Sequence, residues 1–394
     1  MKIDHIDVVN LLFPITDNMR FAYSGGHLTG RLTTLVRVTT NHGIIGIGAA
    51  YGHPMLIRTI IEHHLAPMLI GEDPVEVETL WHKMYRLTRW YGRKGVAISA
   101  LGALDTAFWD LRGKAQGKPV YALLGGTRNS VPAYASALLW SDDIDGLAAE
   151  AAGYVAQGYR RVKMRLGKSE AYDTAAVRAV RQSVGSSVGV IVDASMRYSL
   201  EVAERMAALL EELDVFWYEE PFEPDDIDNY VALRQRISVP IAAGENEFGV
   251  EGFRELLRAA AVDVVQPDAC RAGGITACHQ VGVMAAQYGA SVGPHTWSDA
   301  VALTANAHVV ASLPNGLSVE VDRTGNPFID DLLMEPLDIR DGLLHLADAP
   351  GLGIALNQDT VDRYTLPPDQ PIPDGAYSDM SFGKIYDVDM APYE

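Results

Sequence analysis

The sequence predicts an α/β protein: a (β/α)8 (TIM-like) barrel with an N-terminal α+β capping domain that the C-terminal segment completes. From about Val131, short apolar runs recur at intervals of roughly 23 to 30 residues, and helical material follows each run. Eight such runs fit the eight strands of a barrel. They are VPAYAS, RVKMRLG, VGVIVDAS, VFWYEEP, VPIAAGE, VDVVQPD, ASVGPHT and LSVEVD.

The first third of the chain mixes strand and helix patterns. HIDVVNLLF predicts a strand, and LTTLVRVTTNHGIIGIGAA predicts a hairpin that turns at Asn41-His42-Gly43. Three stretches with helical periodicity follow: PMLIRTIIEHHLAPMLIG, VEVETLWHKMYRLTRWYG and GVAISALGALDTAFWDLRGKA.

We expect residues 1–126 to form the capping domain and residues 127–340 to form the catalytic barrel. Residues 341–394 are predicted to return to the capping domain. The run after Asp341, GLLHLADAPGLGIAL, predicts a further strand pair. The proline- and aspartate-rich tail from Pro367 is expected to cross the surface in extended form.

Composition narrows the classes of function. The chain has 394 residues, of which 48% are hydrophobic, and a formal net charge of −19. This acidity argues against binding to nucleic acid or to a membrane surface. Its N-terminus lacks the pattern of a secretory signal, and two cysteines cannot form a disulfide framework. We therefore expect a cytoplasmic enzyme.

Seven consecutive runs of the predicted barrel carry an ionisable residue at the carboxyl end. In this fold, the carboxyl ends of the strands build the active site. A single polar residue there is explained by capping of the next helix. Seven in a row, with lysine and glutamate among them, favour a functional site. In chain order they are Lys163 and Arg165, Asp193, Glu219, Glu245, Asp268, His295 and Glu320.

Three of these acids follow one another on neighbouring strands. Asp193, Glu219 and Glu245 would surround one point, where like charges repel unless a cation lies between them. Oxygen ligands alone suit a hard divalent ion, Mg²⁺ before Mn²⁺, and do not suit zinc. The alternative is that these acids pair with Lys163 and Arg165.

Asp268 and His295 lie on the adjacent sixth and seventh strands. A carboxylate beside an imidazole fixes its tautomer and raises its basicity, which is typical of a general acid–base. Glu320, on the eighth strand, is either a protonated hydrogen-bond donor or an ionic partner of Arg323, and the sequence does not choose between these roles.

VKMRLG places Lys163 and Arg165 two residues apart, so in a strand both point to one face, opposite Val162, Met164 and Leu166. Buried cations need partners. An anionic substrate fits between this pair and His295. Proton abstraction α to a carboxylate gives an enediolate, which a divalent metal and a lysine stabilise.

Over nearly its whole length, the sequence resembles the enolase superfamily, mandelate racemase subgroup. The resemblance rests on a set of motifs in order: GALDTAFWDLRGKAQGKPVYALLGG, VKMRLG, VDAS, WYEEP, GEN, QPDACRAGGIT, GPHT and SVEVD. It implies Mg²⁺ bound by Asp193, Glu219 and Glu245 and a His295–Asp268 acid–base dyad. It also implies that Glu320 hydrogen-bonds the substrate carboxylate, and that the chain forms homo-oligomers.

The sequence departs from the family's Lys-x-Lys at Arg165. Arginine stays protonated and is a poor base, which argues against racemisation by two bases. In members that resemble this chain, the common reaction is dehydration of a sugar acid to a 2-keto-3-deoxy acid. Either Lys163 or His295 is then the base. A racemase or epimerase of a 2-hydroxy acid is the alternative, and a non-catalytic binding protein would have lost the acids or the dyad.

A mono- or dicarboxylate sugar acid needs polar partners from loops over the barrel mouth. The candidates are Asn18, Arg20, Tyr23 and His27 on one predicted cap loop and Tyr51 and His53 on a second. Of these, Arg20 best suits a second terminal carboxylate, because its guanidinium binds carboxylates through two hydrogen bonds.

Overall fold

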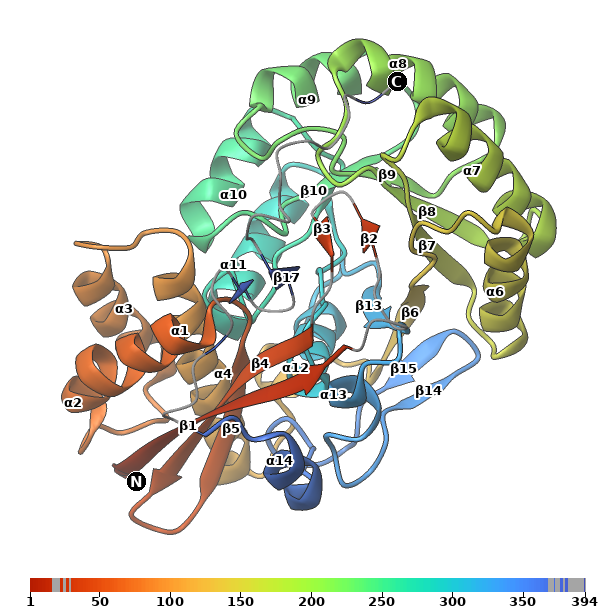
Figure 1. Ribbon diagram of the computed structural model, residues 1–394. Helices are drawn as coiled ribbons and strands as arrows, with labels where there is room; N and C mark the ends of the chain where they lie inside the picture. Colours follow the sequence, from red (N-terminus) through yellow and green to blue (C-terminus); the bar gives the residue numbers. More distant parts are fainter. Residues whose placement is uncertain are drawn as a thin grey trace.

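The computed structural model describes residues 1–15, 22–23, 26–27, 30–367, 372, 376–377, 380–381 and 393. Of residues 22–23, 26–27, 376–377 and 380–381 only the backbone is described. An arc of helices surrounds the parallel strands of the barrel, and the sheet and helices of the capping domain lie at one side of it (Figure 1). Within these residues, no helix has the length and apolar character needed to cross a membrane.

The capping domain is built on an antiparallel sheet. Its strands are β1 (Ile3–Pro14), β4 (Gly30–Thr40) and β5 (Ile45–Ala50), in the order β1-β4-β5. The predicted strand and hairpin are confirmed, and the turn between β4 and β5 lies at residues 41–43.

Helical segments follow this sheet in the chain. They are α1 (Pro54–Ile60), the π-helical turn η2 (Ile61–Leu65), α2 (Ala66–Leu69), α3 (Val77–Thr88), α4 (Val96–Gln116) and α5 (Val120–Leu123). Glycines let α4 approach β5 closely: a Cβ on Gly48 would lie 2.0 Å from the carbonyl oxygen of Ala103. The buried α4 therefore lies directly on the sheet.

All eight predicted barrel strands are present. They are β6 (Ser130–Ser136), β7 (Arg161–Arg165), β8 (Gly189–Asp193), β9 (Trp217–Glu219), β10 (Ile241–Ala243), β11 (Val264–Val265), β12 (Ser291–Val292) and β13 (Val319–Asp322). Neighbours from β6 to β12 pair in parallel, β13 pairs with β6, and a bridge between Val292 and Gly316 closes the ring. The barrel prediction is confirmed.

Helices follow the strands and form the outer layer. They are α6 (Ile144–Ala156), α7 (Glu170–Val184), α8 (Leu200–Glu212), α9 (Ile227–Arg234), α10 (Gly249–Arg258), α11 (Gly274–Gln287), α12 (Ala300–Ser312) and α13 (Pro327–Asp330). Side-chain oxygens of Asp143, Ser169, Ser199 and Asp299 cap four of them by accepting hydrogen bonds from backbone amides.

The barrel interior is packed below the carboxyl ends of its strands. Tyr134, Ile191, Trp217, Ala242 and Val264 form one buried cluster. Ile191 and Trp217 precede Asp193 and Glu219 by two residues, so each pair shares one face of its strand. This apolar layer excludes water from beneath the acids.

The C-terminal segment contacts both parts of the molecule. β14 (Asp338–Arg340) and β15 (Leu343–His345) form a hairpin, and β15 pairs with the barrel strand β6. After α14 (Gln358–Tyr364), the amide of Leu366 donates to the carbonyl of Asn10 in β1. The three domain bounds stay predictions.

The predicted strand pair after Asp341 is wrong. The first strand of the observed hairpin, β14, precedes Asp341, because the chain turns at Asp341 and Gly342, both of which have positive φ. Beyond Pro367 the structure describes residues 372 and 393, and the backbone of β16 (Ala376–Tyr377) and β17 (Met380–Ser381). β17 contacts β3 (Gly26–His27), which pairs with β2 (Ala22–Tyr23). The predicted extended tail lies largely outside the described residues.

The capping domain holds the start of the barrel helix α11. The buried carboxylate of Asp105 in α4 accepts hydrogen bonds from the amide (2.9 Å) and hydroxyl (2.6 Å) of Thr276. Trp81 in α3 donates its indole N–H to the carbonyl of Gly273 at 2.7 Å. Burial raises the pKa of Asp105 to about 7, although the bonds from Thr276 lower it. These contacts fix the loop that carries Asp268.

We expect Asp105→Ala to lower the free energy of unfolding by about 2–4 kcal/mol, because two buried donors of Thr276 lose their acceptor. Urea unfolding followed by circular dichroism measures this. Because folding raises the pKa of Asp105 from its ordinary value of 3.8, the stability that Asp105 contributes is lost as pH rises toward 7. The difference in free energy of unfolding between wild type and Asp105→Ala should therefore shrink as pH rises from 5 to 7.

Asp228→Ala is the matched control, since Asp228 is an exposed acid in the first turn of α9. It should leave the unfolding midpoint near that of the wild type. An Asp105→Ala variant as stable as this control would show that the hydrogen bonds between Asp105 and Thr276 contribute little to the stability of the fold.

Candidate active site

The strand register aligns the first polar residues of the site. Arg165 of β7 lies opposite Asp193 of β8, and Asp193 lies opposite Glu219 of β9. Lys163 and Arg165 share one face of β7, as predicted, while Val162 and Met164 are buried in the hydrophobic core on its other side.

Three other predicted residues lie just beyond their strands. Glu245 follows the end of β10 by two residues, and Asp268 and His295 follow β11 and β12 by three. Glu320 lies within β13. The eight predicted barrel residues therefore gather at one end of the barrel, some on strands and some on the loops that follow.

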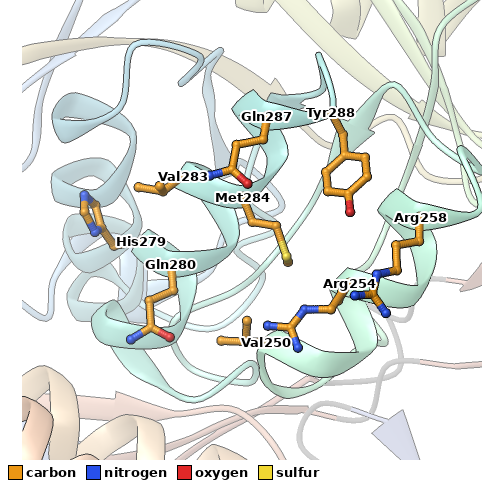
Figure 2. Close-up of a pocket in the computed structure, with 9 residues that line it drawn as sticks. All are labelled: Val250, Arg254, Arg258, His279, Gln280, Val283, Met284, Gln287 and Tyr288. Carbon is orange, nitrogen blue, oxygen red and sulfur yellow. The ribbon is translucent and has the colours of Figure 1, made fainter.

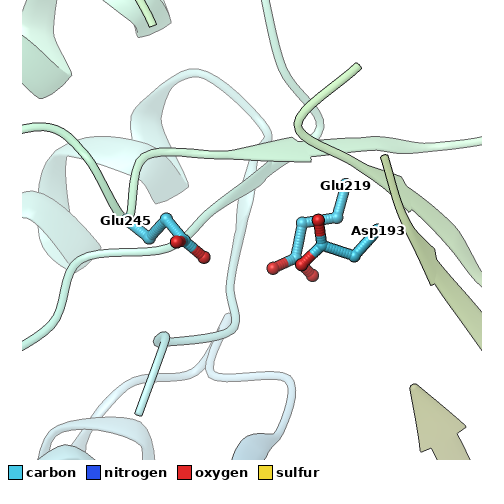
Figure 3. Close-up of side chains that lie close together, drawn as sticks. All are labelled: Asp193, Glu219 and Glu245. Carbon is cyan, nitrogen blue, oxygen red and sulfur yellow. The ribbon is translucent and has the colours of Figure 1, made fainter. Parts of the chain in front are cut away.

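The three acids predicted as metal ligands converge. One carboxylate oxygen from each of Asp193, Glu219 and Glu245 lies within 4.8 Å of the others. Glu245 reaches toward the other two from the opposite side (Figure 3). All of the donor atoms are oxygens, which suits Mg²⁺ or Mn²⁺.

Two buried cations neutralise part of this charge. The Nζ atom of Lys163 lies 3.1 Å from Asp193, 2.5 Å from Glu219 and 2.9 Å from Glu320. Arg165 Nη1 donates to Asp193. The alternative, in which the acids pair with Lys163 and Arg165, thus holds for Asp193 and Glu219. Glu245 lies instead 3.8 Å from Nε2 of His295.

Among the described residues, the carboxylates of Asp193, Glu219, Glu245 and Glu320 outnumber the two cations that they face, Lys163 and Arg165. The buried Oε2 atom of Glu245 accepts no hydrogen bond from that part of the chain. Burial raises the pKa of Glu219 to about 8, and neighbouring carboxylates add to this, although Lys163 lowers it. The residues present therefore fit a divalent cation.

Asp268 and His295 form a hydrogen-bonded dyad. Nδ1 of His295 lies 2.9 Å from Oδ2 of Asp268, so its Nε2 atom faces the acids, 3.8 Å from Glu245. Burial lowers the pKa of His295, but Glu245 and the hydrogen bond to Asp268 outweigh it and raise the pKa to about 9. Nε2 is the atom placed to exchange a proton with a ligand.

Of the two roles that the sequence left open for Glu320, the pair with Arg323 is wrong, while the protonated hydrogen-bond donor stays a prediction. Its carboxylate pairs with Lys163 and accepts from the amide of Thr296 at 2.8 Å, whereas Arg323 pairs with Asp330. Burial raises the pKa of Glu320, but Lys163 and His295 outweigh it and lower the pKa to about 2. Glu320 thus lies on the Lys163 side of the site.

The predicted cap-loop contacts are described only in part. Asn18 and Arg20 lie outside the described residues, as do the side chains of Tyr23 and His27. Tyr51 is buried, with its ring 6.1 Å from that of His295.

His53 lies at the start of α1. Its buried Nδ1 atom has no hydrogen-bond partner within the described ranges. Of the six predicted cap-loop residues, Tyr51 is thus the one whose described side chain lies beside the dyad.

Sequence reasoning missed several residues of the site. The buried Trp297 contacts two guanidinium groups, with Cζ of Arg165 5.1 Å and Cζ of Arg31 4.8 Å from its ring centroid. Arg31 comes from β4 and pairs with Asp322 at 3.0 Å. The position of Trp297, two residues after His295, was the available signal.

Asn306 of α12 was also missed. Its amide nitrogen donates to Asp268 Oδ1 (3.1 Å) and to the carbonyl of His295 (3.0 Å), which ties the two halves of the dyad together. An asparagine inside an apolar helix gives no signal of this role in the sequence.

A separate pocket of about 480 Å³ lies on the outer layer of the barrel, between α10 and α11. Arg254 and Arg258 of α10 face Met284 and Tyr288 across it (Figure 2). None of its lining residues belongs to the predicted site, and the pocket is built from helices and not from strand ends.

Comparisons with known proteins agree with this architecture. Residues 18–125 match the mandelate racemase / muconate lactonizing enzyme N-terminal domain, and residues 146–360 match the family described as enolase C-terminal domain-like. The chain is 36% identical over 332 residues to an arabinonate dehydratase of Saccharolobus solfataricus, covering 83% of this chain and 89% of that protein.

Two further relatives extend the comparison. A D-galactarolactone cycloisomerase of Agrobacterium fabrum is 32% identical over 349 residues, which cover 86% of this chain and 92% of the relative. The crystal structure of L-talarate dehydratase from Polaromonas sp. JS666, complexed with Mg and L-glucarate, superposes with a TM-score of 0.82 at 30% identity. That match covers 93% of this chain and 98% of the other. The chain therefore belongs to the enolase superfamily, in its mandelate racemase and muconate lactonizing enzyme group.

Proposed function

We propose that this protein is a Mg²⁺-dependent hydro-lyase that converts a sugar acid to a 2-keto-3-deoxy acid. One arrangement carries the proposal: the His295–Asp268 dyad faces Lys163 and Arg165 across three convergent carboxylates. Such a site can take a proton from the carbon next to a carboxylate and stabilise the resulting charge.

The names of relatives support this reaction. They include an arabinonate dehydratase and an L-talarate dehydratase with bound Mg and L-glucarate. We extend from them a small sugar acid as substrate and Mg²⁺ as cofactor. That the chain forms homo-oligomers and works in the cytoplasm stays a prediction.

Asp193, Glu219 and Glu245 would hold the ion, which supplies positive charge beside the substrate carboxylate. Lys163 and Arg165 donate hydrogen bonds to that carboxylate and to the enediolate formed from it. Glu320 keeps Lys163 oriented toward the acids, at 2.9 Å.

His295 supplies the proton for the leaving group. The base, either Lys163 or His295 itself in a syn elimination, removes the C2 proton, and the C–H electron pair moves into the carboxylate to give the enediolate. That pair then forms the C2=C3 bond as the C3–O bond breaks. Nε2 of His295 protonates the departing hydroxyl, which leaves as water. The enol then tautomerises to the ketone. Asp268 holds Nδ1–H throughout, so Nε2 remains the reacting atom.

We propose that the cap selects the substrate. Tyr51 lies beside the dyad, and Arg20, Asn18, Tyr23, His27 and His53 stay candidates for the hydroxyl groups and a second carboxylate.

The main alternative is a racemase or epimerase that uses the same enediolate. Arg165 argues against it, because a guanidinium stays protonated while racemisation needs a base on each face of the carbon. A test must therefore separate loss of water from inversion at C2.

The test is a screen of mono- and dicarboxylate sugar acids with Mg²⁺ in D₂O. Semicarbazide detects a ketoacid product, and NMR detects deuterium at C2 of recovered substrate. We expect at least one acid to yield a 2-keto-3-deoxy acid. Recovered substrate that is deuterated and inverted at C2, without ketoacid, would establish the racemase. An isomer formed from a lactone without loss of water would instead indicate a cycloisomerase.

Glu245→Gln should weaken Mg²⁺ binding by more than about 100-fold, since even outer partners of metal ligands are worth about 10- to 100-fold. Titration calorimetry on protein treated with EDTA measures the affinity. Glu247→Gln is the matched control, because Glu247 lies two residues away and pairs with Lys94 at 2.8 Å. Equal affinities in the two variants would remove Glu245 from the metal site.

His295→Asn should abolish dehydration, with turnover falling at least about 1,000-fold, because no other group takes over proton transfer to the leaving oxygen. Mg²⁺ affinity should stay near that of the wild type. His279→Asn, in α11 at the outer pocket, is the control and should retain activity. Normal turnover by His295→Asn would refute the role of the dyad.

A further inference from the structure

Tyr393, near the C-terminus, contacts the barrel close to two loops of the site. The hydroxyl of Tyr393 donates to Oδ2 of Asp173 at 2.8 Å, and its ring lies 4.7 Å from that of Tyr198 in an edge-on contact. The sequence reasoning assigned no role to Tyr393.

Asp173 is a fully buried carboxylate that gathers donors from three segments. It accepts from the amides of Gly167 (2.9 Å) and Lys168 (3.3 Å) on the loop after β7, and from the hydroxyl of Tyr198 (2.6 Å) on the loop after β8. Tyr393 adds the donor from the C-terminus. Asp173 therefore links the two loops to each other and to the end of the chain.

These two loops follow Arg165 and Asp193 directly. They touch each other: a Cβ on Gly167 would lie 2.9 Å from the carbonyl of Ala194. The second loop also holds the metal-site acid itself, because the amide and hydroxyl of Ser195 donate to Oδ1 of Asp193 at 2.8 and 3.0 Å. A shift of this loop would therefore turn the Asp193 carboxylate.

The loop after β8 is strained. Ser195 and Met196 adopt φ values of 45° and 65°, in the left-handed region that non-glycine residues rarely occupy. Each such residue costs about 1–3 kcal/mol, and the conformation persists only where surrounding contacts hold it. The bond from Tyr198 to Asp173, supported by Tyr393, is such a contact at the end of the strained segment.

We propose that Tyr393 is a positioning residue for the active site: from the C-terminus it fixes Asp173 and Tyr198, and through them the loops that orient Arg165 and Asp193. Its effect on catalysis rests on the proposed function, whereas its effect on the loops does not. The ring and the hydroxyl act separately, the ring on Tyr198 and the hydroxyl on Asp173.

The test compares Tyr393→Phe, which keeps the ring, with Tyr393→Ala, which removes the ring as well. Hydrogen–deuterium exchange is followed in peptides that span residues 166–173 and 194–198. We expect exchange in both peptides to rise about threefold in Tyr393→Phe and about tenfold or more in Tyr393→Ala, since a net hydrogen bond is worth roughly a factor of 2–10. Peptides from the capping-domain sheet should not change.

Two further readouts separate positioning from general stability. Mn²⁺ affinity, measured by electron paramagnetic resonance, should fall about threefold or more in Tyr393→Ala and less in Tyr393→Phe, because Asp193 loses its fixed orientation. With a substrate in hand, kcat should fall in the same order while KM changes little. The unfolding midpoint should stay near that of the wild type in Tyr393→Phe.

Tyr288→Phe is the matched control, since Tyr288 ends α11 and is half exposed. Unchanged loop exchange and Mn²⁺ affinity in Tyr393→Ala would overturn the proposal. Faster exchange across the whole protein would overturn it too, because the role would then be general stability. If no sugar acid is turned over, the exchange and Mn²⁺ data still decide the role of Tyr393, while the proposed function alone fails.

Discussion

An imbalance of buried charge dominates this structure. At the carboxyl ends of the barrel strands, Asp193, Glu219, Glu245 and Glu320 face Lys163 and Arg165, with an apolar layer packed beneath them. Buried carboxylates without partners are costly, so the fold tolerates this cluster only with protons or cations at hand. The same excess of negative charge makes this end of the barrel suited to a divalent ion.

The rest of the molecule serves to hold this cluster in place. The parallel strands bring Arg165, Asp193 and Glu219 level with one another. The capping domain fixes the Asp268 loop through Asp105, and Asn306 joins Asp268 to His295. In the proposed reaction these groups would not touch the reacting atoms, yet proton transfer would depend on where they place Nε2 of His295.

Much of this could be predicted from the sequence, because barrel strands are buried on both faces and appear as short apolar runs with polar residues at their ends. The even spacing of acids placed Asp193 and Glu219 correctly. It did not show that Glu245 lies beyond its strand, since a count along the sequence carries no register. Contacts between distant segments, such as those of Trp297 with two arginines or of Tyr393 with Asp173, leave no pattern of spacing. These were found only in the folded chain.

The most direct test of the account is a crystal structure of the protein soaked in Mn²⁺, with anomalous diffraction data collected at the manganese edge. The account predicts one strong anomalous peak, with oxygen atoms of Asp193, Glu219 and Glu245 about 2.0–2.3 Å from it. Lys163 should then lie beside the ion, still paired with Glu320. A peak elsewhere on the chain, or an empty cluster in which Lys163 keeps its bonds to Asp193 and Glu219, would contradict the account.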